Sequence, residues 1–306
     1  MPSLGNRSIR LFRFAGIDVF LHWSWFLVAL YEIESRAGRY SSITWNAIEY
    51  LALFLIVLLH EFGHALACRQ VGGTADRIVL WPLGGVAYVN PPPRPGATLW
   101  SIAAGPLVNV AFLIIFMVFG YTNRATGWAD AIPNLHPFLH MVAIINLVLL
   151  VFNLLPIYPL DGGKILRSLL WFVLGRARSL MVATVIGFGG VAAMILFALW
   201  LRSAWYGVMA VFILMNCWGG LQQARALSKL AKLPRREGFL CPACKAAPPV
   251  GNVWKCNRCG QLFDTFQTAA TCPKCAAHFT ATRCLECGAP NPLSAWRESG
   301  AASAAA

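Results

Sequence analysis

The sequence predicts an all-α, polytopic membrane protein that ends in a small cysteine-rich module. Of its 306 residues, 58% are hydrophobic and only 12% are charged, whereas a soluble domain carries about 25% charged residues. The apolar residues gather in stretches close to the roughly 20 residues that a membrane-spanning helix needs. A water-soluble fold could not bury this much apolar surface, so the soluble classes are excluded.

The apolar stretches predict about six transmembrane helices. The first is interrupted by Asp18 and His22, and the last two are so close that they must form a tight antiparallel hairpin. The six predicted spans are residues 14–31, 46–68, 99–121, 138–160, 180–201 and 203–222.

Residues 77–90 predict a β-hairpin between the second and third spans. Strand-forming residues flank Gly84 and Gly85, a pattern typical of two strands joined by a turn. This hairpin could be re-entrant or interfacial, or a plain cytoplasmic hairpin, and Pro91, Pro92 and Pro93 give it a stiff exit.

The basic residues predict the orientation. The net charge is +13, and basic loops concentrate on the cytoplasmic side. With six spans, both termini are then cytoplasmic, and we expect a multi-pass protein of the plasma (inner) membrane without a removable signal peptide. The basic residues that mark this side are Arg7, Arg10, Arg13, Arg69, Arg77, Arg94, Lys164, Arg167, Arg176 and Arg178.

This organisation divides the chain into four parts. Residues 1–222 form the membrane domain, 223–240 a basic linker suited to anionic lipid, 241–290 the cysteine-rich module, and 291–306 a tail. The tail is expected to be disordered from Gly300.

The most specific motif runs from His60 through Glu61 to His64. Two histidines at positions i and i+4 share one helix face, so both imidazoles can reach one zinc ion. Glu61 can then take a proton from an attacking water. Such polar groups are costly inside an apolar helix unless they are used, and the alternative is a histidine pair satisfied by neighbouring helices.

Asp161 is the predicted third ligand. A catalytic zinc usually has three protein ligands and an open position. Asp161 is predicted to close the fourth helix at the cytoplasmic end, at a depth similar to His60 and His64, after Pro156 and Pro159 break the helix. The alternative is an interfacial aspartate that caps a loop.

These motifs resemble the site-2 protease family of intramembrane metalloproteases. The segment 60–64 matches its zinc motif, and Asn153, Pro156, Leu160, Asp161 and Gly162 match its second motif, with further likeness at 82–87, 104–109 and 16–24. The resemblance covers roughly residues 10–222, and the six-helix plan is similar to the branch that includes the bacterial sporulation sigma-factor protease.

The resemblance implies a zinc endopeptidase that cuts transmembrane proteins in the lipid bilayer. His60, His64 and Asp161 then bind the catalytic zinc and Glu61 is the base. It also implies that the 77–90 region dips into the membrane and pairs with extended substrate. Asn153 and His22, the latter placed on the first helix, are candidates for oxyanion or substrate contacts, or else buried polar groups bonded between helices.

The cysteine-rich module predicts a double zinc ribbon. Four Cys-x-x-Cys pairs each offer two thiolates, two pairs make a closed structural zinc site, and the pattern fits a reducing compartment. Sequential pairing is expected, first with second and third with fourth, while a crossed pairing stays open. The predicted ligands are Cys241, Cys244, Cys256, Cys259, Cys272, Cys275, Cys284 and Cys287.

The module's purpose is less defined than its metal content. A protein partner is favoured, and nucleic acid is disfavoured because there is no dense basic stripe. The competing function is an inactive membrane scaffold that recruits partners through the ribbons. A metal transporter is a third hypothesis, disfavoured because the sequence has no internal repeat.

Overall fold

The structure, a computed structural model, describes residues 8–35, 38–81 and 84–296, so the expected disorder from Gly300 lies outside the described residues. In this part of the chain, four helices are long and apolar enough to cross a membrane. They are α2 (Ile43–Gln70), α3 (Pro95–Thr126), α4 (Leu135–Leu154) and α5 (Asp161–Trp200). The fold is therefore mostly helical and suited to a bilayer, and it does not confirm the predicted count of six spans.

The N-terminal region is a sheet, and the prediction of a helical span over residues 14–31 is wrong. Strands β1 (Ser8–Phe14) and β2 (Ile17–His22) precede a short helix, α1 (Ser24–Ser35), of 12 residues. Residues of β2 alternate between buried and half-buried, which is the period of a strand and not of a helix. Oδ1 of Asp18 on β2 forms an ion pair with Nη2 of Arg10 on the neighbouring strand β1, at 2.6 Å.

Four strands form one mixed sheet in the order β1-β2-β3-β4, so the fold is not all-α. The other two are β3 (Thr74–Trp81) and β4 (Gly84–Asn90), which pair antiparallel with each other. β2 joins the sheet parallel to β3. Residues 77–90 thus lie in paired strands, and their placement at or in a membrane stays a prediction.

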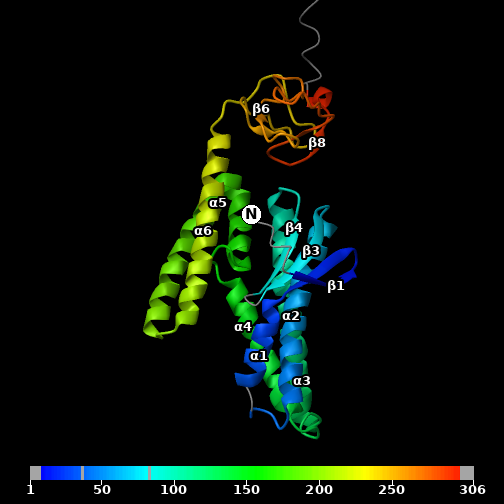
Figure 1. The fold of residues 1–306 in the computed structure, drawn as a ribbon, viewed down its shortest axis with the longest axis vertical. Helices are drawn as coiled ribbons and strands as arrows, with labels where there is room; N and C mark the ends of the chain where they lie inside the picture. Colours follow the sequence, from blue (N-terminus) through cyan, green and yellow to red (C-terminus); the bar gives the residue numbers. More distant parts are fainter. Residues whose placement is uncertain (1–7, 36–37, 82–83, 297–306) are drawn as a thin grey trace, which may run out of the picture.

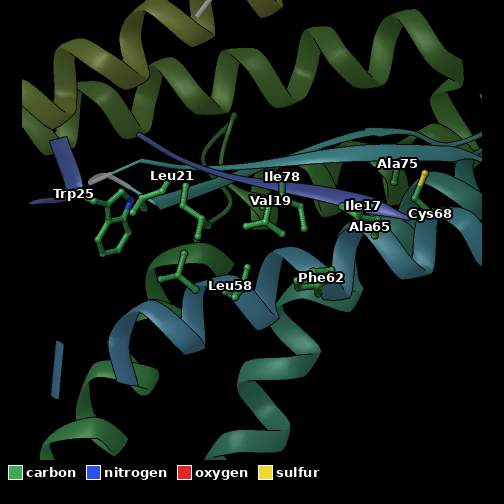
Figure 2. Packing of buried hydrophobic residues seen from close by; sticks show 12 residues of the cluster. Ile17, Val19, Leu21, Trp25, Leu58, Phe62, Ala65, Cys68, Ala75 and Ile78 are labelled. Carbon is green, nitrogen blue, oxygen red and sulfur yellow. The ribbon is translucent and has the colours of Figure 1, made fainter. Parts of the chain in front are cut away.

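One face of this sheet packs on the C-terminal half of α2 (Figure 2). Ile17 and Val19 of β2 and Ile78 of β3 are fully buried against Phe62 and Ala65 of α2. Burying apolar side chains contributes roughly 1.5–3 kcal/mol for each large one. The sheet therefore anchors the helix that carries both histidines.

Asp161 begins a helix and does not end one, which corrects the predicted position. α4 stops at Leu154, residues 155–160 form a turn, and α5 starts at Asp161. A carboxylate in the first turn is favoured by the helix dipole. α5 is itself interrupted at Gly175, whose φ of 75° and ψ of 172° are not helical.

The last helix, α6 (Ala204–Ala231), packs along α5 and carries the module at its upper end (Figure 1). It includes the first half of the predicted basic linker. The module contains β5 (Trp254–Lys255), β6 (Leu262–Phe263), β7 (Thr282–Arg283), β8 (Pro290–Asn291) and the short helix η2 (Leu293–Trp296). Trp296 is buried beside Cys241 and Cys284, so the module extends past residue 290.

Candidate metal centres and active site

Three side chains from two helices meet beneath the sheet. His60 and His64 lie one turn apart on α2, and Asp161 opens α5. Asp161 Oδ2 lies 3.0 Å from Nε2 of each histidine, and the two Nε2 atoms are 3.1 Å apart. Atoms bound to one tetrahedral zinc at about 2.0–2.1 Å are about 3.3 Å apart. The near-equilateral triangle therefore fits three ligands of one zinc ion.

The partners of the other ring nitrogens leave both Nε2 atoms free to bind a metal. Nδ1 of His64 lies 2.9 Å from the carbonyl oxygen of Ser101, which can only accept, so this Nδ1 carries the proton. Nδ1 of His60 donates in the same way to Oδ1 of Asn109, at 2.6 Å. Such second partners orient metal-binding histidines.

Two asparagines hold that arrangement in place, and sequence reasoning missed both roles. Asn109 of α3 donates through Nδ2 to Oδ1 of Asn146 on α4, and Asn146 donates back to the Asn109 carbonyl, each at 2.9 Å. Both side chains are almost completely buried. The sequence did contain a signal for them, because each is a polar amide inside an apolar helix. Buried polar groups need hydrogen-bond partners, so each asparagine could have been expected to contact another polar group.

Asp161 is held by its own helix. Its second oxygen, Oδ1, accepts from Lys164 Nζ at 3.3 Å, so Oδ2 is left to face the histidines. Gly162 and Gly163 let the α5 start press against the preceding turn. A Cβ at Gly162 would lie 2.2 Å from the Leu154 carbonyl oxygen, which only glycine avoids.

Glu61 points toward the sheet and not into solvent. Its Oε2 accepts the backbone N–H of Ala87 on β4 at 2.7 Å. Gly85 lies so close that a Cβ there would be 2.3 Å from Glu61 Cγ. The carboxylate next to the first histidine is therefore held by an edge strand.

His22 lies on a strand and not on the predicted first helix, whereas Asn153 lies on the helix where it was expected. His22 ends β2, and not the first helix, with Nδ1 2.5 Å from Ser24 Oγ and its ring stacked on Trp81. Asn153 is half-buried in the last turn of α4. Among the described residues, no hydrogen bond joins either side chain to the triad, so their roles stay predictions.

The module contains four copies of one backbone turn. In each, the first cysteine N–H donates to the carbonyl five residues later, and its carbonyl accepts from the N–H four residues later. Lys245, Gly260, Ala276 and Gly288 occupy that fourth position with positive φ. Each turn presents two sulfur atoms on one side, as a zinc knuckle does.

The knuckles pair in a nested way, which corrects both the sequential and the crossed expectation. The first knuckle meets the fourth, with 3.7 Å between Sγ atoms of Cys241 and Cys287 and of Cys244 and Cys284. We call this the outer site. The second meets the third, and the inner site has 3.6 Å between Cys256 and Cys275 and between Cys259 and Cys272. Ligands of a tetrahedral zinc with Zn–S of about 2.3 Å are about 3.8 Å apart, so both sites fit zinc.

Backbone donors favour the metal-binding form of one thiol of the inner site, Cys256. The N–H groups of Cys259 and then of Arg258 help to lower the pKa of Cys256 to about 6. Since the thiolate is the form that binds metal, this lowered pKa favours metal binding by Cys256.

Comparisons with known proteins agree with this geometry. Residues 48–134 and 126–197 match Peptidase family M50. The chain is 36% identical to zinc metalloprotease MJ0392 of Methanocaldococcus jannaschii over 194 residues, which is 63% of this chain and 55% of that protein. It is 30% identical over 212 residues to putative zinc metalloprotease Rip3 of Mycobacterium tuberculosis, covering 64% of this chain and 52% of Rip3.

A solved structure supports the same assignment. The site-2 protease from Methanocaldococcus jannaschii superposes with a TM-score of 0.51 at 30% identity, covering 70% of this chain and 95% of that one. The matches to MJ0392 and Rip3 span only 55% and 52% of those relatives' own lengths. Since the histidine motif and Asp161 both lie inside the matched regions, the chain belongs to Peptidase family M50, the site-2 proteases.

Proposed function

We propose that this protein is an intramembrane zinc metalloendopeptidase that hydrolyses peptide bonds within or near transmembrane segments of membrane proteins. The observation that carries the proposal is the convergence of His60, His64 and Asp161 Oδ2 within 3.1 Å of one another, beside the carboxylate of Glu61. Family membership and the four apolar helices support it.

In this proposal His60, His64 and Asp161 hold the catalytic zinc, which when bound acidifies a water molecule and polarises a carbonyl. Glu61 accepts the proton of the attacking water and returns it to the leaving amine. Asn109 and Ser101 keep the proton on Nδ1 of each histidine. Asn153, in the last turn of α4, is retained as a candidate to hold substrate backbone.

The edge of β4 is the proposed substrate platform. Within the described part of the chain, β4 pairs with β3 on one side only, and its other edge directs the Ala87 N–H at Glu61. An extended substrate segment added to this edge would place its backbone beside the triad. Strand addition recognises the substrate mainly through hydrogen bonds to its backbone and less through its side chains, so we expect modest sequence specificity.

The wider setting is also proposed. The protein would be multi-pass in the plasma (inner) membrane with both termini cytoplasmic, and would bind three zinc ions, one catalytic and two structural. A protein partner of the ribbons is proposed as well. The competing hypothesis is a catalytically inactive scaffold, and the intact Glu61 argues against it.

Glu61→Gln tests this function. The amide keeps the size of the side chain and can still accept the Ala87 N–H, but it cannot accept a proton. We expect membranes carrying the variant to accumulate intact single-span proteins relative to wild type, measured by comparative proteomics, with three zinc ions still bound. Unchanged processing in the variant would reject the proposed mechanism, and two zinc ions in the wild-type protein would favour the scaffold.

A further inference from the structure

The proposed active site is closed in this structure. His60, Glu61, His64 and Asp161 are only 5–7% exposed. A peptide bond cannot reach these groups unless some covering element moves. β4 is the element in direct contact with the proposed base, through Ala87 N–H and the close approach of Gly85.

The zinc ribbon touches the membrane domain next to the exit of β4. A Cβ built at Gly288 would lie 3.3 Å from Pro93 Cγ, so the last knuckle rests on the third of the three prolines that follow β4. Prolines restrict the backbone, so the position of Pro93 limits where the end of β4 can move. Figure 1 shows the module lying above the upper end of β4 and the upper part of α5.

The same knuckle is tied to α5. Nη1 of Arg176 donates to the Leu285 carbonyl at 3.1 Å, and the Arg176 guanidinium lies 5.8 Å from the ring centre of Trp171. Arg176 directly follows Gly175, where α5 is interrupted. The knuckle of residues 284–288, which we call the docking knuckle, therefore lies on both the β4 exit and the α5 interruption.

Because the pairing is nested, the outer zinc site attaches the docking knuckle to the first knuckle of the module. Cys284 and Cys287 share that site with the first knuckle, which follows directly from α6 and its linker. Arg235 of the linker adds an ion pair to Glu286 at 2.9 Å. The ligands of the inner site include no residue of the docking knuckle, whose Leu285 only packs against the apolar cluster around them.

We propose that the docking knuckle is an intramolecular interaction surface that braces β4 over Glu61 and so restrains substrate entry. The proposal rests on the proposed protease function for its consequence, although the docking itself does not. Loss of the outer metal site releases the knuckle, β4 moves more easily from Glu61, and its edge becomes available for strand addition. The inner site has no such effect.

Hydrogen exchange on the full-length protein in detergent tests the docking directly. Arg176→Ala removes the bond to Leu285, and Arg178→Ala is the matched control, because Arg178 is exposed two residues away. We expect amide exchange in residues 84–90 to accelerate several-fold in Arg176→Ala and to match wild type in Arg178→Ala. Cys287→Ser should act like Arg176→Ala, and Cys275→Ser should leave residues 84–90 unchanged.

Cleavage by the same variants tests the restraint. The probe is a tagged single-span protein chosen from those that accumulate with Glu61→Gln. Arg176→Ala and Cys287→Ser should raise its initial cleavage rate several-fold, while Arg178→Ala and Cys275→Ser should not. Unchanged exchange in Arg176→Ala and Cys287→Ser overturns the docking, and faster exchange without faster cleavage overturns the restraint. If no variant cleaves any membrane protein, the protease function fails while the exchange result still reports on docking.

Discussion

Individual residues explain why the proposed metal ligands can approach so closely. Gly105 of α3 faces the imidazoles, and a Cβ there would lie 2.3 Å from both Cε1 and Nε2 of His64 and 2.9 Å from Nε2 of His60. A real Cβ cannot occupy that space, so the ligands would have to move. The absence of a side chain at Gly105 is thus a condition of the site.

Gly105→Ala should therefore remove the membrane zinc ion while the helices still form. Alanine is favoured over glycine in a helix by about 1 kcal/mol, so loss of metal would reflect the clash and not helix propensity. Metal analysis of purified protein should fall from three zinc ions to two. Gly120→Ala on the same helix is the control, because its Cβ would meet nothing within 4 Å; three zinc ions in Gly105→Ala would contradict the clash.

Individual residues also show a limit of sequence reasoning. The ligand types and the i, i+4 spacing of His60 and His64 are readable, because one helix turn brings them together. Asn109 lies 49 positions along the chain from His60, which it contacts, and Asn146 lies 37 positions from Asn109. No local spacing encodes such contacts, which arise only when α2, α3 and α4 pack.

At the scale of elements, β4 connects the sheet to the chemistry. It is an edge strand, and such edges present unpaired N–H and C=O groups that another chain can pair with. In β4 one of these groups, the Ala87 N–H, is used by Glu61. The strand therefore both positions the proposed base and offers the proposed substrate edge.

Gly85→Ala should lower proteolysis strongly by pushing β4 and Glu61 apart. Its Cβ would lie 2.3 Å from Glu61 Cγ and 2.6 Å from Oε1, so either the strand or the carboxylate must shift. Displacement of a catalytic group by about 1 Å can cost about 100-fold in rate, which initial rates on a membrane-anchored substrate would measure. Val86→Ala is the control, since Val86 is 48% exposed; equal losses in both variants would indicate general damage to the strand.

The sequence mispredicted the segment in which the spacing of apolar residues and the overall apolar composition indicate different structures. Residues 14–31 are apolar enough to be read as a span, but their first part alternates with period two and joins a sheet. The sheet forms because β3, more than 50 residues later, supplies a parallel partner for β2. Composition alone does not distinguish a buried strand from the start of a membrane helix.

At the scale of the whole molecule, the nested cysteine sites close the module on itself. The outer site joins its first and last knuckles, and the buried Trp296 packs beside them. A segment this short has a small core, so we expect metal binding to supply much of its folding free energy. The outer site also fixes the end of the module that contacts the membrane domain.

Paired cysteine substitutions distinguish the three possible pairings by zinc count. With nested sites, Cys241→Ser with Cys287→Ser should lose one zinc ion, because both damage the outer site. Cys241→Ser with Cys256→Ser should lose two. Sequential pairing predicts the reverse, and crossed pairing predicts two lost in both double variants, so one metal analysis decides among them.

Short-range patterns in the chain were enough to identify a membrane metalloprotease relative with metal-binding knuckles. Helical spacing, the length of apolar stretches and Cys-x-x-Cys pairs are properties of residues close together in the sequence. They can therefore be recognised without knowing how the segments pack. Three-dimensional packing was needed for the mixed sheet, the helix start at Asp161, the asparagine partners and the nested cysteine sites. Each of these depends on which distant segments bury their surfaces together, and that free energy belongs to the whole fold and to no single stretch of sequence.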